Sequence, residues 1–183
     1  MHRFVWATAR LWIRLRSGRK PPRHLPDPVW YFTFGSNMNE RLFRERRHMT
    51  PIESKVVRLD HYRLCFTVAG GHRPGASAPA NIRPARGETV YGVLYLLPLR
   101  KFARLDASEG RQYEYLEVDV IDASGAVVRA KSYIGPADAP EGRPSRAYLE
   151  IVRAAARERG LPVEYIALLD GIEPREASKR DAA

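Results

Sequence analysis

The sequence predicts an α+β fold in which a small, mostly antiparallel β-barrel is flanked by helices. Runs rich in aliphatic, β-branched and aromatic residues recur along the chain, which is typical of strands. A hairpin turn, Asp122-Ala-Ser-Gly125, joins the last two of these runs. Segments with helical spacing are appended to the strands. A chain of 183 residues is the size of one domain and can bury about two-thirds of its unfolded surface.

The expected elements follow in chain order. The first strand is the alternating apolar run 31–34, which stops at Gly35. Further strands are expected at residues 55–59, 62–68, 89–97, 114–121 and 126–134. Helices are expected at residues 39–47, 98–108, 145–159 and 162–169. Residues 70–79 have the composition of a loop, and the run 80–84 follows it.

The segment after the first strand has the form of an anion-binding loop. Gly35 lets the backbone approach a ligand closely, and Ser36 and Asn37 can cap the helix that follows. The unpaired N–H groups at the start of that helix then point toward the loop, where they suit a carboxylate or a developing oxyanion. Gly-Ser-Asn is also an ordinary turn sequence, so the loop alone does not establish a site.

Glu109 is the second candidate feature. The helix expected at 98–108 has Phe102 and Leu105 on one face, and Gly110 is a C-terminal stop. Glu109 therefore lies at the end of the helix that carries partial negative charge, where an ionised carboxylate is disfavoured. Such a placement favours a role in proton transfer near neutral pH. The alternative is a solvated glutamate in a helix cap.

Together these segments resemble the gamma-glutamylcyclotransferase family, over roughly residues 29–174. The residues that carry the resemblance are Phe34-Gly35-Ser36-Asn37-Met38, Leu105-Asp106-x-x-Glu109-Gly110, Pro144-Ser145-x-x-Tyr148, Gly160-Leu161-Pro162-Val163-Glu164-Tyr165 and Gly171-Ile172-Glu173-Pro174. The family's loop usually begins with tyrosine, so Phe34 removes one hydroxyl. Asn37 separates the chain from the glutathione-degrading relatives, which carry a different residue after Gly-Ser.

The resemblance implies an enzyme that cyclises a gamma-glutamyl group to 5-oxoproline and releases the free amine, with Glu109 as general acid and base. The substrate would be a small gamma-glutamyl amino acid, amine or biosynthetic intermediate. The residues that the resemblance assigns to substrate binding are Phe34, Gly35, Ser36, Asn37, Met38, Asn39, Tyr115 and Tyr148. It also places the run 80–84 near the site. No cofactor or metal is implied, and the five histidines show no ligand spacing.

Other functions compete with this interpretation. The fold could serve as a non-catalytic binding module for a gamma-glutamyl or amino-acid-like ligand, although such a module has no need for Glu109. Tyr115 and Tyr148 could equally be packing residues with their hydroxyls at the edge of the core. Nucleic-acid binding is not expected, because aromatics interleaved with Lys and Arg are missing. Neither the leaving group nor the oligomeric state follows from the sequence.

The N-terminal segment is separate in character. Residues 1–27 hold seven Lys or Arg against Asp27, so they carry +6 of the net +10. Arginines and apolar residues fall on different faces of a helix over residues 3–16, which favours peripheral contact with an anionic membrane surface. A disordered basic tail, a helix docked on the domain, or extra residues from an upstream start codon are the alternatives.

The chain is thus divided into a basic extension (1–27), a gamma-glutamylcyclotransferase-like domain (28–176) and a short tail (177–183). The extension is too short and too charged to span a bilayer, and it lacks a signal-peptide cleavage site. The single cysteine, Cys65, excludes an internal disulfide and fits a reducing compartment. We therefore expect a cytoplasmic protein that contacts a membrane surface, if at all, through residues 3–16.

Overall fold

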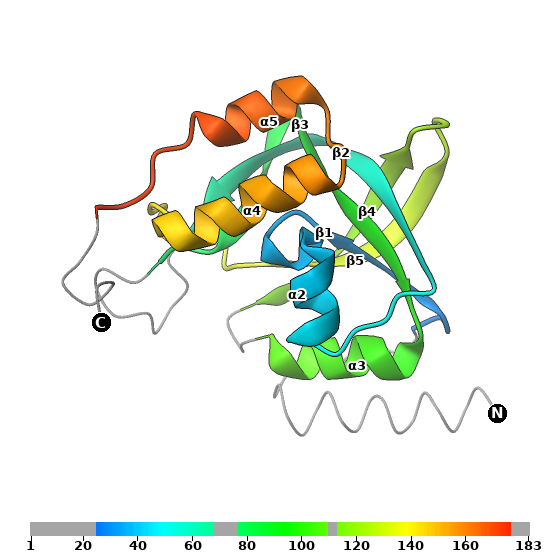
Figure 1. Ribbon diagram of the computed structural model, residues 1–183. Coiled ribbons are helices and arrows are strands. Elements are labelled where there is room, and N and C mark those ends of the chain that lie inside the picture. The colour runs from blue at the N-terminus through cyan, green and yellow to red at the C-terminus, as the bar shows by residue number, and fades with distance from the viewer. Residues whose placement is uncertain (1–24, 68–76, 110–112, 177–183) are drawn as a thin grey trace.

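Five strands close into a barrel in the computed structural model, which describes residues 25–67, 77–109 and 113–176 (Figure 1). The strands are β1 (Val29–Thr33), β2 (Glu53–Phe66), β3 (Ala80–Leu97), β4 (Glu114–Asp122) and β5 (Val127–Ile134). They are ordered β1-β3-β2-β4-β5, and all neighbouring pairs are antiparallel except β1 with β5, which closes the barrel in parallel. The predicted α+β fold with a mostly antiparallel barrel is confirmed.

Helices cover the outside of this barrel, as Figure 1 shows. They are the 3₁₀ turn η1 (Ser36–Met38) and the helices α2 (Glu40–Glu45), α3 (Leu99–Ser108), α4 (Arg146–Glu158) and α5 (Val163–Asp170). Within the described residues, these four α-helices begin and end within two residues of their expected bounds. The side chain of Ser145 accepts from the N–H of Tyr148 and caps α4, while Asp27 Oδ1 accepts from Leu99 N at the start of α3.

The longest strands differ from the expectation. Residues 55–59 and 62–68 were expected as separate runs, but residues 53–66 form one strand, β2, with a shift of register between Asp60 and Tyr62. His61 lies at this irregularity with a φ of 65°, so a bulge replaces the expected break. The run 80–84 is the first part of β3 and pairs with residues 62–66. The residue types predicted strand ends in this region, but the hairpin of β2 and β3 continues through it.

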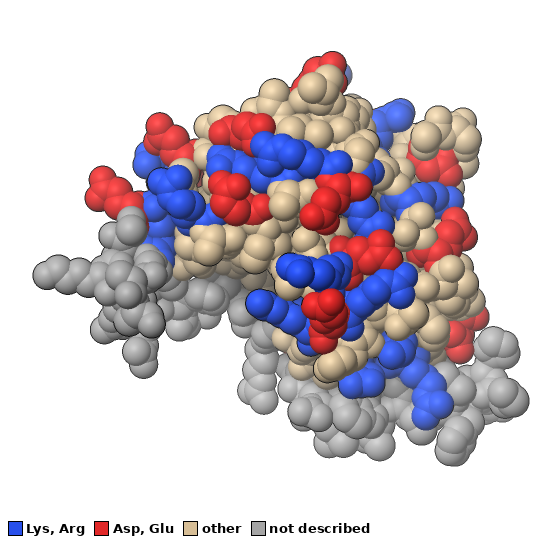
Figure 2. Space-filling view, viewed as in Figure 1, with Lys and Arg blue, Asp and Glu red and all other residues tan. Residues whose placement is uncertain are grey.

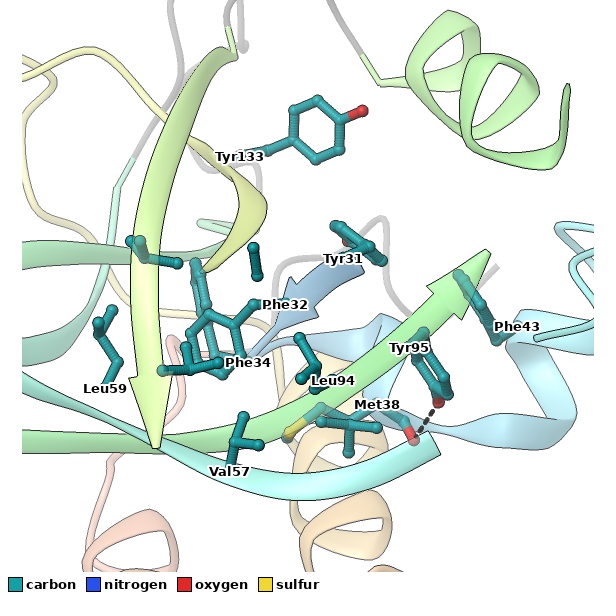
Figure 3. Packing of buried hydrophobic residues seen from close by; sticks show 14 of the residues in the cluster. Tyr31, Phe32, Phe34, Met38, Phe43, Val57, Leu59, Leu94, Tyr95 and Tyr133 are labelled. Atoms are coloured by element: carbon teal, nitrogen blue, oxygen red, sulfur yellow. Dashed lines mark hydrogen bonds between the residues drawn. The ribbon is translucent and has the colours of Figure 1, made fainter. Parts of the chain in front are cut away.

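The core fills the barrel and extends under α2 and α3. Phe32 and Leu94 are fully buried inside the barrel, and the ring of Tyr95 stacks on Phe43 of α2 with centroids 4.6 Å apart. Figure 3 shows Met38 beside Tyr95, whose hydroxyl donates to the Met38 carbonyl oxygen. This contact attaches the segment after β1 to the barrel wall.

Charged groups on the surface are largely paired. On the face drawn in Figure 2, basic and acidic side chains intermingle. Arg157 lies 2.6 Å from Asp170, and Arg159 lies 3.0 Å from Glu40. Such pairs neutralise much of the domain's charge locally.

Several predictions concern residues that the structure does not describe. The extension through residue 24, loop residues 70–76, Gly110 and the tail 177–183 lie outside the described residues. Within the described ranges, no helix is both long and apolar enough to cross a bilayer.

Candidate active site

A cavity of about 380 Å³ opens where β1 ends, between the ends of α2 and α3, β5 and the side of α4. Most of the polar and aromatic groups in its wall come from these elements. The described lining residues are Tyr31, Phe32, Thr33, Phe34, Gly35, Ser36, Asn37, Arg47, Ser77, Pro79, Ala80, Ser108, Glu109, Tyr113, Ser132, Tyr133 and Tyr148. The two features singled out in the sequence, the Gly-Ser-Asn loop and Glu109, therefore face the same space.

The loop after β1 is held as a single 3₁₀ turn. Met38 N donates to Gly35 O at 3.0 Å, and Asn39 N donates to Ser36 O at 3.1 Å. Ser36 and Asn37 were expected to cap the following helix, but Asn39 is the cap, since its Oδ1 accepts from Leu42 N at 2.9 Å. The extra turn moves the cap two residues downstream and leaves the Asn37 side chain at the cavity.

Asn37 connects the loop to Glu109. Its Nδ2 donates to the Tyr31 hydroxyl at 3.0 Å and lies 3.5 Å from Glu109 Oε1. Glu109 is the residue that ends α3, and its N–H donates to Leu105 O and Asp106 O. The glutamate side chain is 13% exposed, and Arg47 Nη2 lies 3.7 Å from its Oε1. A carboxylate, an amide and a guanidinium from three separate elements thus converge at one point.

A second set of contacts fixes the loop from behind. The Tyr95 hydroxyl donates to the carbonyl oxygens of Asn37 and Met38 at 3.2 and 3.3 Å. Arg159 Nε donates to Met38 O at 3.2 Å, and its Nη2 donates to the Tyr95 hydroxyl at 2.7 Å. No sequence pattern identified Tyr95 or Arg159, because this support comes from residues 57 or more positions away.

Tyr148 reaches the loop from α4. Its hydroxyl oxygen accepts from Ala80 N at 3.1 Å, and Ser36 also hydrogen-bonds to it. Burial raises the pKa of this hydroxyl, so it is neutral at physiological pH. Ala80, in the run that the resemblance placed near the site, lines the cavity.

Three of the residues named from the sequence do not line the cavity. Met38 is fully buried in the core, and Asn39 caps α2. Tyr115 packs its ring on those of Phe102 and Tyr133, with centroids 6.4 and 5.5 Å apart. Their side chains serve the scaffold that carries the loop and α3.

The lining residues that sequence reasoning missed include an arginine and three tyrosines: Arg47, Tyr31, Tyr113 and Tyr133. Burial raises the pKa of Tyr31 and Tyr133, and it raises that of Tyr113 to about 12. The nearby Glu109 charge adds to all three shifts. The Tyr133 hydroxyl already donates to Asp106 Oδ1 at 2.9 Å. The neutral phenols of Tyr31 and Tyr113 can donate hydrogen bonds to an anionic or carbonyl oxygen. Among the described residues, no cluster of His, Cys, Asp and Glu is suited to a metal ion.

The close approach of Gly35 to Tyr148 gives a testable expectation. A Cβ at Gly35 would lie 2.9 Å from the Tyr148 hydroxyl and 3.2 Å from Ala80 Cβ. We expect Gly35→Ala to lower the free energy of unfolding by about 1–3 kcal/mol through overpacking. The loss should be smaller in a Tyr148→Phe background, which removes the nearer atom. Urea unfolding of the four proteins in this double-mutant cycle measures both values; strictly additive losses would show that Tyr148 does not limit the space.

Comparisons with known proteins point to one family. The model of the AIG2-like family matches residues 89–169. Human gamma-glutamylcyclotransferase is 30% identical over 158 residues, covering 80% of this chain and 79% of the human one. The gamma-glutamyl cyclotransferase aclK of Aspergillus oryzae is 27% identical over 84% of this chain, which spans 65% of the fungal protein's length. A solved gamma-glutamyl cyclotransferase structure superposes with a TM-score of 0.73 at 26% identity, covering 84% of this chain and 95% of that one.

Proposed function

The chain belongs to the gamma-glutamylcyclotransferase family, and we propose that it cyclises the gamma-glutamyl group of an amino acid or amine to 5-oxoproline, releasing the free amine. The observation that carries this proposal is the position of Glu109, whose Oε1 lies 3.5 Å from Asn37 Nδ2 in the wall of a shared cavity. A proton-transferring carboxylate next to an oxyanion-binding loop is what an acyl transfer without water requires.

The reaction needs no outside nucleophile. The substrate's own α-amine attacks its γ-carbonyl carbon, so a C–N bond forms and the carbonyl electrons move to oxygen. The C–N bond to the leaving amine then breaks as the carbonyl re-forms. Glu109 takes a proton from the attacking nitrogen and gives one to the leaving nitrogen, so protons balance over the cycle. Binding the substrate in a folded conformation supplies a large part of the rate acceleration, because it keeps the α-amine close to the γ-carbonyl carbon.

The loop would bind the substrate through few N–H groups. Those of Met38 and Ser36 already donate to Gly35 O and the Tyr148 hydroxyl. The proposal therefore rests on the N–H groups of Gly35 and Asn37 for the α-carboxylate or the oxyanion. The neutral tyrosines of the cavity add donors that stay protonated at physiological pH.

The cellular setting is a proposal of the same kind. The sequence pattern and the family alone support three further points. These are a cytoplasmic location, action on glutathione-derived gamma-glutamyl compounds, and membrane contact through residues 3–16.

Release of 5-oxoproline from a panel of compounds tests the proposed function. The panel contains gamma-glutamyl amino acids, gamma-glutamyl amines and glutathione, with α-glutamyl-alanine as a matched control in which the leaving amine is on the wrong carbonyl. We expect release of 5-oxoproline and amine from at least one gamma-glutamyl compound and none from the control. If every compound binds and none reacts, the chain is a gamma-glutamyl binding module instead.

A further inference from the structure

Arg47 holds a position in the cavity that the proposed reaction does not yet use. It follows the residue that ends α2, and its own N–H donates to Leu42 O at 3.3 Å. Its Nη1 donates to Ser108 Oγ at 2.6 Å, while Nη2 lies 3.7 Å from Glu109 Oε1. The side chain is 32% exposed. One arm of the guanidinium is therefore anchored to α3, and the group faces a cavity that solvent and substrate can enter.

Few of the described residues in the cavity wall are charged. Among the described lining residues, Arg47 is the only cation and Glu109 the only anion. A gamma-glutamyl amino acid brings one ammonium and two carboxylates, and the loop N–H groups of Gly35 and Asn37 can take the first carboxylate, that of the glutamyl half. The second belongs to the leaving amino acid and needs a partner of its own. A guanidinium suits it, because its planar N–H groups match the two oxygens of a carboxylate.

Distances within the substrate put this second carboxylate near Arg47. To protonate the leaving nitrogen, Glu109 must lie about 3 Å from it. In an amino acid the carboxylate carbon is two bonds from the nitrogen, which is about 2.5 Å away. Glu109 contacts the leaving nitrogen, and the carboxylate lies close to that nitrogen. The carboxylate is therefore within reach of the Arg47 guanidinium, which lies 3.7 Å from Glu109.

We propose that Arg47 binds the carboxylate of the leaving amino acid and so selects gamma-glutamyl amino acids over gamma-glutamyl amines. This inference rests on the proposed function and names its substrate class. A leaving amine without a carboxylate would leave the guanidinium with Ser108 and Glu109 alone. The selection would arise from one charge-assisted contact that only one class of substrate can make.

A competing role for Arg47 is to act through Glu109, by stabilising its negative charge. The two roles differ in what they predict for different substrates. An effect on Glu109 changes the turnover of every substrate by the same factor and shifts the acid limb of the pH profile. A contact with the leaving carboxylate changes only substrates that carry that group, mainly through KM.

The test compares gamma-glutamyl-alanine with gamma-glutamyl-ethylamide, which is the same molecule without the leaving-group carboxylate. The kcat and KM of the wild-type chain, Arg47→Gln and Arg47→Lys are measured with both substrates at several pH values. Gln keeps a donor for Ser108 and removes the charge, and Lys keeps the charge without the planar fork. Because Arg47 is partly exposed, both variants should fold, which thermal unfolding checks.

We expect the wild type to prefer gamma-glutamyl-alanine in kcat/KM. In Arg47→Gln that preference should fall by about 10- to 100-fold, the range of a lost charged hydrogen bond, with partial recovery in Arg47→Lys. Equal losses on both substrates, or a wild type that favours the ethylamide, would overturn the inference and leave the proposed function standing. A wild type that releases 5-oxoproline from neither substrate, nor from any compound of the panel, would overturn both.

Discussion

Replacing Glu109 with Gln is expected to lower kcat for 5-oxoproline release by about 10²- to 10⁴-fold. Gln has the size and shape of Glu but cannot accept a proton from the substrate ammonium. The Asn37 Nδ2 that lies 3.5 Å from Glu109 Oε1 can still face an amide oxygen, so the cavity should keep its shape. Substrate binding should therefore survive while chemistry is lost. Turnover by rapid quench and substrate binding by calorimetry measure the two effects separately.

Matched variants make this result specific. Glu45→Gln makes the same chemical change at an exposed position on α2 and should leave kcat unaltered. Glu109→Asp keeps the carboxylate but withdraws it by one methylene, so its rate should lie between wild type and Glu109→Gln. Full activity in Glu109→Gln would remove this residue from the mechanism, whatever the cavity looks like.

The sequence identified the loop and Glu109 but not the reason that they meet, since they are 72 residues apart. Val29 at the start of β1 pairs with Leu97 at the end of β3, and α3 begins two residues later at Leu99. The ten residues of α3 rise about 15 Å, close to the length of about 17 Å of the five-residue β1. Tyr31 packs on Phe102, so the two elements run side by side. Helix and strand then end together, which places Glu109 at the loop.

The meeting of Glu109 with the loop depends on the pairing of β1 with β3, which amino-acid composition does not predict. The wrong predictions for single residues have a similar origin. Asn37 and Asn39 are both good helix caps by chemistry, and only the 3₁₀ turn decides which of them caps α2. Tyr113 and Tyr115 are two residues apart, and only the packing against α3 decides that the first lines the cavity. Residue type predicts what a side chain can do, while its neighbours in space decide whether it does so.

The second large effect is expected at Gly92, in the middle of β3. A Cβ here would lie 2.7 Å from Phe32 Cε2 and closer still to the carbonyl oxygen of Thr33. Neither neighbour can move easily, because Phe32 is fully buried and Thr33 O belongs to the backbone of a strand paired on both sides. We expect Gly92→Ala to lower the free energy of unfolding by more than about 3 kcal/mol, as seen for the most severe overpacking. Urea unfolding measures this.

Gly171→Ala is the matched control for that substitution. Its added Cβ would meet only two carbonyl oxygens at 3.5 and 3.6 Å, and its φ of −73° suits any residue. Stability should change by less than about 1 kcal/mol. Because Thr33 leads directly into Phe34 and Gly35, any Gly92→Ala protein that does fold should also have a displaced loop and a raised KM. A stable Gly92→Ala protein with an unchanged KM would show that β1 can shift away from β3 without disturbing the cavity.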